Sequence, residues 1–150
     1  MDRAKFESII DFAIERENEA VKFYADLEQN SRFADIKNML HEFKLMEKSH
    51  IDILKNIKNQ NVEAMNVPKV ENLRISEYLV PPAKKSDLSY QDILIIAMKR
   101  EELSHSLYTT LAEDFDDPEI KKLFEKLASE EATHKLGFEK IYDRDILKEN

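Results

Sequence analysis

Four segments of the chain place apolar side chains at alternating steps of three and four residues, the spacing that gathers them on one face of an α-helix. This pattern predicts helices over residues 3–29, 32–59, 88–114 and 118–143. In each segment a glutamate interrupts the apolar stripe near its middle, at Glu17, Glu47, Glu101 and Glu131. His50 and His134 follow the second and fourth of these glutamates by three residues, so each histidine lies on the same stripe as its glutamate.

The first two predicted helices resemble the last two. A shift of 84 residues, the separation of Glu17 and Glu101, aligns both pairs of helices without a gap. Nine of the 42 positions from residue 13 to residue 54 are then identical, whereas chance would give about three. The matches include the polar residues on the stripes, as the pairs Glu17/Glu101, Glu47/Glu131 and His50/His134. We interpret the chain as two copies of one helical hairpin.

The connections predict how the helices are joined. Two short polar segments, 30–35 and 114–119, each separate the helices of one hairpin, and Asp117 and Pro118 have the residue types preferred at a helix N-cap and first helical position. Short connections make neighbouring helices antiparallel. The segment of about residues 60–87 contains three prolines and is long enough to run the length of a bundle. We therefore expect one all-α domain over residues 1–150, an antiparallel four-helix bundle with a long crossover.

Composition narrows the class of protein further. The net charge is −8 and no basic cluster is present, which argues against nucleic acid as a partner. The chain has no cysteine, so disulfides and thiolate metal sites are excluded. No apolar run approaches the roughly 18 residues of a membrane span, and the N-terminal residues carry charges where a signal peptide would be apolar. We expect a cytoplasmic protein that does not bind membranes.

The polar residues on the stripes predict a dinuclear metal site. Four carboxylates and two imidazoles would be buried at one level, and each uncompensated carboxylate would cost several kcal/mol. Two divalent cations would cancel the four negative charges. Mixed oxygen and nitrogen ligands suit iron or manganese, and they are also compatible with zinc. The expected ligands are Glu17, Glu47, His50, Glu101, Glu131 and His134.

Two interpretations without a metal stay open from the residues alone. A single Glu-x-x-His pair in a helix rich in lysine and glutamate is usually a solvated surface pair. A buried network with Arg16 and Arg100 is the other alternative, although both arginines point off the stripe. Among other residues, Tyr24 and Tyr108 are candidates to hydrogen-bond the carboxylates without being metal ligands themselves. His41 lies off the stripe, where a surface position is expected.

The motifs that carry these residues resemble those of the rubrerythrins, a branch of the ferritin-like proteins. The resemblance rests on "ERENEAVKFY" with "EKSH" and on "KREELSHSLY" with "EATH", and it spans about residues 5–142. It implies a ferritin-like bundle with a di-iron centre in which Glu47 and Glu131 bridge the two iron ions. The chain departs from the family at Ser104, where rubrerythrins have an extra glutamate used in a redox-linked ligand exchange.

The resemblance also implies an activity. The expected function is that of an oxidoreductase that reduces peroxide or dioxygen. Rubrerythrins carry a cysteine-ligated iron domain that this cysteine-free chain lacks, so a separate electron-donor protein is the expected partner. The alternative is iron handling, in which ferrous iron is bound and oxidised without turnover of a reductant. A homodimer is expected by analogy with ferritin-like bundles, although no apolar stripe in the sequence requires one.

Overall fold

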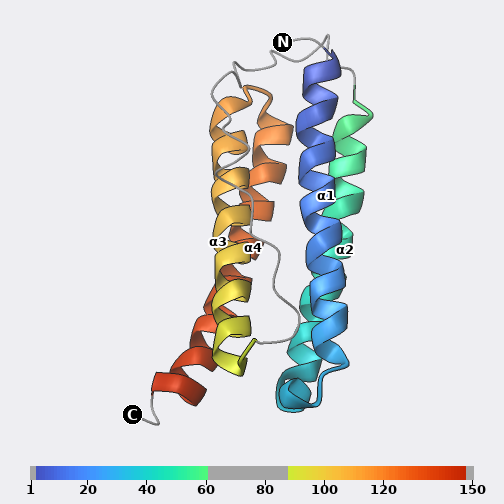
Figure 1. Cartoon of the computed structure of the whole chain (residues 1–150). Coiled ribbons are helices and arrows are strands. Elements are labelled where there is room, and N and C mark those ends of the chain that lie inside the picture. The colour runs from blue at the N-terminus through green and yellow to red at the C-terminus, as the bar shows by residue number, and fades with distance from the viewer. Residues whose placement is uncertain (1–2, 61–87, 148–150) are drawn as a thin grey trace. The chain divides into compact units, whose positions relative to one another are not determined.

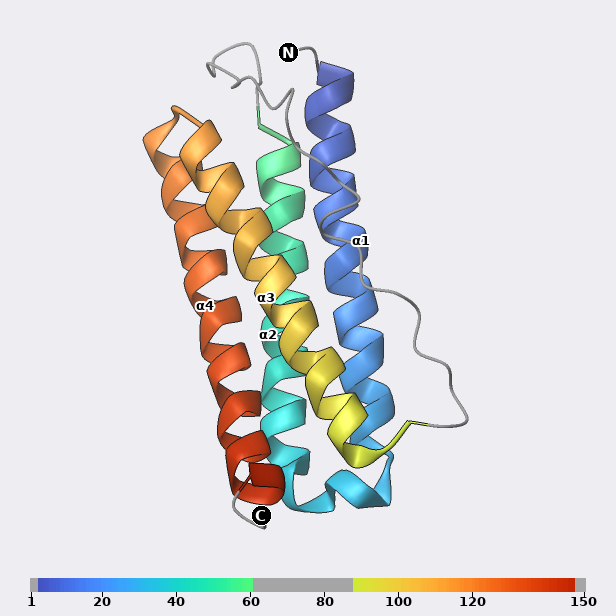
Figure 2. The same ribbon diagram turned by 60° about the vertical axis from the view of Figure 1, so that its left-hand side comes forward.

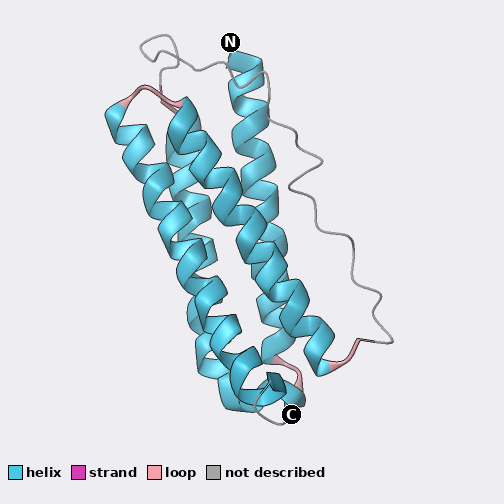
Figure 3. Ribbon diagram, turned by 90° about the vertical axis from the view of Figure 1, so that its left-hand side faces the viewer, coloured by secondary structure: helices cyan, strands magenta, loops and turns pink. Residues whose placement is uncertain are grey.

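The computed structural model describes residues 3–60 and 88–147, and these residues form helices with short connections and no strand (Figure 3). The all-α class expected from the sequence is therefore confirmed. The expected crossover lies almost entirely outside the described residues. The elements, in chain order, are α1 (Arg3–Glu28), the 3-10 helix η1 (Ser31–Ile36), α2 (Lys37–Lys58), α3 (Tyr90–Asp114), α4 (Pro118–Tyr142) and the π-helical segment η5 (Asp143–Leu147).

Helices α1 and α2 form the first hairpin and lie side by side in antiparallel directions (Figures 1 and 2). Lys58, at the end of α2, pairs with Asp11 near the start of α1, with 2.7 Å between Nζ and Oδ1. Lys44, nearer the start of α2, pairs with Glu28 at the end of α1 over the same distance. The turn between α3 and α4 belongs to the same compact unit, because the ring of Phe115 packs edge-on against Phe6.

Helices α3 and α4 form the second hairpin, which is also antiparallel. The Tyr90 hydroxyl at the start of α3 donates to Asp145 in η5, 2.6 Å away. His105, in the middle of α3, contacts the carbonyl oxygen of Ala128 in α4 at 2.8 Å from its Nδ1 atom. Contacts between the ends and between the middles of the two helices thus hold this hairpin together along its length.

The helix boundaries agree with the sequence expectation within two residues except at the second helix. The expected start at residue 32 is wrong, because residues 31–36 form a 3-10 helix and the α-helix begins at Lys37. Phe33 has a non-helical backbone conformation (φ −109°, ψ 18°), while its ring is fully buried. The apolar spacing therefore continues through a kink, which explains why periodicity alone placed the helix start too early.

Side-chain caps fix the starts of α3 and α4. The Ser89 hydroxyl accepts a hydrogen bond from the Asp92 amide, and the Asp92 carboxylate accepts one from the Ser89 amide, both at 3.1 Å. This reciprocal cap places the helix start at Tyr90 instead of residue 88. Asp117 accepts hydrogen bonds from the amides of Glu119 and Ile120 at 3.0 and 3.1 Å, which confirms it as the N-cap of α4.

The stripes expected to be buried are buried. Along α1 every residue of the predicted stripe, from Phe6 to Leu27, is at most 8% exposed. The other helices follow the same rule, with half-buried exceptions at Phe43, Tyr90, Ser104 and Ile141. No helix within the described residues is long and apolar enough to cross a membrane.

Candidate metal centre

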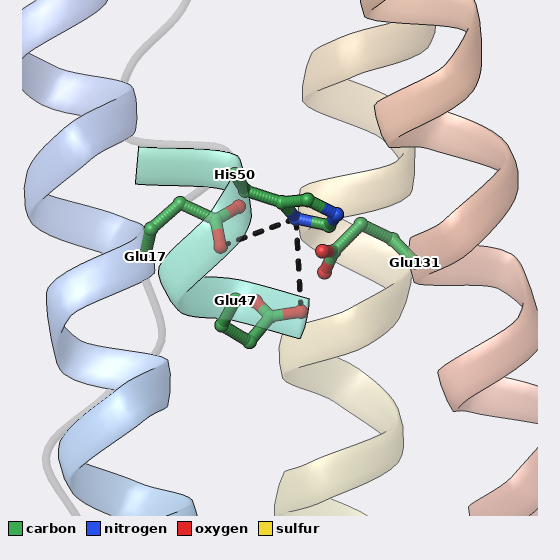
Figure 4. A group of neighbouring side chains, drawn as sticks. All are labelled: Glu17, Glu47, His50 and Glu131. Atoms are coloured by element: carbon green, nitrogen blue, oxygen red, sulfur yellow. Dashed lines mark ion pairs between the residues drawn. The ribbon is translucent and has the colours of Figure 1, made fainter. Parts of the chain in front are cut away.

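The first hairpin brings three of the predicted ligands together. Glu17 comes from the middle of α1, and Glu47 and His50 come from one turn of α2 (Figure 4). The Nδ1 atom of His50 lies 3.4 Å from a carboxylate oxygen of Glu17 and 3.8 Å from one of Glu47. One potential ligand atom from each residue lies within 4.8 Å of the others. All three side chains are at most 1% exposed.

The second hairpin repeats this arrangement with its own three residues. Glu101 comes from α3, and Glu131 and His134 come from one turn of α4. The Nδ1 atom of His134 lies 3.6 Å from a carboxylate oxygen of Glu101, and one ligand atom from each of the three residues again falls within 4.8 Å of the others. Each residue is at most 2% exposed. Each hairpin thus contains a buried cluster of two carboxylates and one imidazole.

The spacing within the clusters suits ligands of a metal ion. Nitrogen-to-oxygen distances of 3.4 to 3.8 Å exceed the roughly 2.7–3.2 Å of ordinary N–H···O hydrogen bonds. Two ligands that each lie about 2.1 Å from a shared ion are separated by about 3 to 4 Å. Each cluster also carries two carboxylates, whose charge one divalent ion would neutralise. The donor set and its spacing therefore fit a divalent metal.

Burial makes the ionised form of the first cluster unfavourable when no metal is bound. The pKa of Glu17 rises from 4.5 to about 8, mainly because burial removes water from the carboxylate and secondly because the Glu47 carboxylate lies nearby. The nearby imidazole of His50 opposes this rise in pKa without overcoming it. A cation bound between these carboxylates would supply the missing compensation.

This raised pKa predicts how the stability of the metal-free protein depends on pH. Because the carboxyl of Glu17 has a pKa of 4.5 when unfolded and about 8 when folded, the folded state holds an extra proton between these values. Its contribution to stability is greatest below pH 4.5 and is lost as the pH rises through 8. For this one proton, the free energy of unfolding is expected to fall by up to about 1.4 kcal/mol per pH unit. Urea unfolding of the metal-free protein, measured from pH 5 to pH 8, gives this slope.

Glu17→Gln is the control for this pH dependence, because the amide has the same shape and does not titrate. In this variant we expect the slope assigned to Glu17 to disappear while the other titrations of the chain remain. A slope that is identical in the two proteins would show that Glu17 does not hold the extra proton.

The ion pairs of Arg16 argue against a salt-bridged network in the first hairpin. Its guanidinium lies 2.8 Å from Glu19 and 3.9 Å from Glu15, and it stacks over the ring of Phe12 at 5.0 Å from the centroid. These partners all lie off the buried stripe, as the sequence spacing indicated. Arg16 is therefore directed away from the cluster, and its ion pairs do not account for the charge of Glu17.

Tyr24 and Tyr108 are buried, with 1% of each residue exposed. The ring of Tyr24 packs edge-on against Phe43, with 6.1 Å between centroids, and Tyr108 stacks on Phe124 at 6.2 Å. These aromatic contacts account for their burial within their own hairpins. A hydrogen bond from either hydroxyl to a carboxylate of the clusters stays a prediction.

Spacing along the helices did not predict a part-buried ionic contact between α1 and α2. Glu28 at the end of α1 is 6% exposed and lies 2.7 Å from Lys44 and 2.9 Å from His41. Hydrogen bonds from these two residues lower the pKa of Glu28. His41 itself is 53% exposed, which agrees with the expected surface position. The partners of Glu28 come from the other helix, and periodicity within one helix does not predict such pairs.

Over residues 3–60 and 88–147, the helices and the two clusters define a class: an all-α protein with four long helices in two hairpins, each with a buried carboxylate and histidine cluster compatible with metal binding. Residues 92–150 match the family model of rubrerythrin, so the resemblance expected from the motifs is confirmed for the second hairpin. That match includes Glu101, Glu131 and His134. The corresponding residues of the first hairpin are assigned through the internal repeat.

A solved structure shows the same fold. The chain is similar to a hypothetical protein from Pyrococcus furiosus, with a TM-score of 0.68 and 23% sequence identity over 91% of this chain and 87% of that one. This likeness confirms the expected four-helix fold class and carries no information about activity. No curated protein matches the chain.

Proposed function

We propose that Glu17, Glu47, His50, Glu101, Glu131 and His134 hold two iron ions per chain. The observation that carries this proposal is that each hairpin buries the same two carboxylates and imidazole with ligand atoms within 4.8 Å of one another. Their charge, their mixed oxygen and nitrogen donors and the rubrerythrin match of the second hairpin favour iron over a purely structural polar core. Manganese and zinc are the competing metals.

We propose that the protein uses this centre as an oxidoreductase that reduces peroxide or dioxygen. Iron, when bound, supplies the electrons. The carboxylates and histidines fix its position, and the surrounding apolar side chains limit access of water. Reduction of one peroxide to two waters consumes two electrons and two protons, which must be replaced after each turnover. Because the chain has no cysteine for a thiolate redox site of its own, a separate electron-donor protein is the proposed source.

Iron handling is the second candidate, and Ser104 is the observation that favours it. Ser104 stands one turn after Glu101 in α3, where the resemblance places the extra glutamate of rubrerythrins. Without that carboxylate, the ligand exchange associated with peroxide reduction in the family lacks its residue. Binding and oxidation of ferrous iron needs only the six proposed ligands.

The two candidates are separated by adding ferrous iron and oxygen to the purified protein and measuring iron per chain together with consumption of peroxide and reductant. The oxidoreductase is expected to stop at about two iron ions per chain while it continues to consume peroxide as long as a reduced donor is supplied. Iron uptake that continues far beyond this number, without turnover of the reductant, would instead establish iron handling.

A further inference from the structure

A groove on the second hairpin lies outside the two clusters. It has a volume of about 490 Å³, and the described residues that line it belong to α3 and α4, the two helices that Figure 2 shows side by side. This volume is within the roughly 300–1,000 Å³ range of small-molecule sites. Its lining residues include three alanines, Ala112, Ala128 and Ala132, which leave space between the helices.

The internal repeat shows why this groove is open. Shifted by 84 residues, Ala112 corresponds to Glu28 and Ala128 corresponds to Lys44. In the first hairpin these two residues form a part-buried ion pair between α1 and α2, with 2.7 Å between Nζ and the carboxylate. The second hairpin replaces both members with alanine. The groove therefore occupies the place that a charged side-chain pair fills in the other copy.

The polar groups around the groove favour a cation as its ligand. Glu113 and Glu125 contribute two carboxylates, and Lys121 contributes one ammonium. No described residue forms an ion pair with Glu113 or Glu125. His105 adds a polar ring atom: its Nδ1 donates to the carbonyl oxygen of Ala128 at 2.8 Å, so Nε2 is the ring nitrogen left to accept a hydrogen bond.

We propose that this groove binds a small free primary amine, with its ammonium group between Glu113, Glu125 and His105 and its short alkyl stem over the alanines. Lys44 shows in the first hairpin that an alkylammonium group suits this place between the helices. A bare divalent ion fits less well, because Glu113, Glu125 and His105 do not bring their ligand atoms within 4.8 Å of one another. This inference is independent of the proposed metal centre.

The test is a calorimetric titration of the full chain with n-butylammonium, with n-butanol and butyrate as the neutral and anionic counterparts. We expect saturable binding of the ammonium ion only. Glu125→Gln is expected to weaken this binding about tenfold, since one charge-assisted hydrogen bond is lost. Lys121→Gln is expected to strengthen it, because a like charge is removed. Equal binding of n-butanol, tighter binding of butyrate, or an unchanged affinity in Glu125→Gln would overturn the proposal.

A double variant tests the origin of the groove while leaving the polar groups Glu113, Glu125 and His105 unchanged. Ala112→Glu with Ala128→Lys transfers the ion pair of Glu28 and Lys44 into the second hairpin and should abolish amine binding. Its melting temperature and helical circular dichroism establish that it is folded. A folded double variant that still binds n-butylammonium with the original affinity would contradict the proposal, and so would manganese ions that displace the amine from the unmodified protein.

Discussion

Replacing Glu131 with alanine is expected to abolish both metal loading and peroxide turnover. Glu131 is fully buried, and its carboxylate is one of the potential ligand groups in the buried cluster of the second hairpin. Residues that only hydrogen-bond the ligands usually contribute about 10- to 100-fold to metal affinity. Loss of a ligand itself should therefore lower the affinity by more than about 100-fold. Metal content after desalting and the rate of peroxide consumption measure the two effects.

Glu130→Ala is the matched control, because the neighbouring residue has the same chemistry at a different exposure. The Glu130 side chain is 22% exposed and lies 4.0 Å from Lys126, a surface pair that contributes little. We expect this variant to keep its metal and its activity. Full metal content in Glu131→Ala would contradict the assignment of Glu131.

Glu47→Ala tests whether the two clusters share their ions. Glu47 corresponds to Glu131 in the repeat, and the resemblance implies that both carboxylates bridge two ions. If they do, either single variant should lose both ions of the chain. We expect loss of both ions; loss of one ion with the other kept would show that each hairpin binds its own ion and would contradict the result expected for Glu131→Ala.

Removal of metal is expected to lower the melting temperature strongly. At a free metal concentration 100 times the dissociation constant, each site adds about 2.7 kcal/mol to the stability of the folded state. Two sites thus add about 5 kcal/mol, and for a chain of this size 1 kcal/mol shifts the melting temperature by roughly 2–4 °C. We therefore expect a decrease of about 10–20 °C when a chelator removes the metal.

The control for this experiment is the Glu131→Ala variant, which should melt at a temperature that no longer depends on the chelator. Calorimetry of both proteins with and without chelator makes the comparison. An unmodified protein whose melting temperature is the same with and without metal would favour a purely structural role for the buried polar residues.

The buried residues of the hairpins could be predicted from the sequence because they follow helix periodicity. Glu17 and Glu47 interrupt stripes that are otherwise apolar, and a stripe of this kind is buried whatever the partner helix is. The repeat then identified Glu101 and Glu131 as their counterparts. Four of the six proposed ligands could thus be found from spacing alone, and the histidines three residues later completed the set.

Features that depend on backbone geometry or on two helices at once were not predictable in this way. The 3-10 helix before α2 preserves the burial of Phe33 while changing the backbone, so spacing does not detect it. The Glu28 and Lys44 pair and the groove beside Ala112 and Ala128 arise between helices. Comparing the two copies of the repeat position by position would have indicated the groove, since charged residues in one copy correspond to alanines in the other.

Metal content per chain tests the central claim most directly. The protein is loaded anaerobically with ferrous iron, desalted and measured by elemental analysis. The six proposed ligands, which are all buried and include four carboxylates, predict about two iron ions per chain that survive desalting. A protein that emerges from desalting without metal, while still folded, would contradict the account.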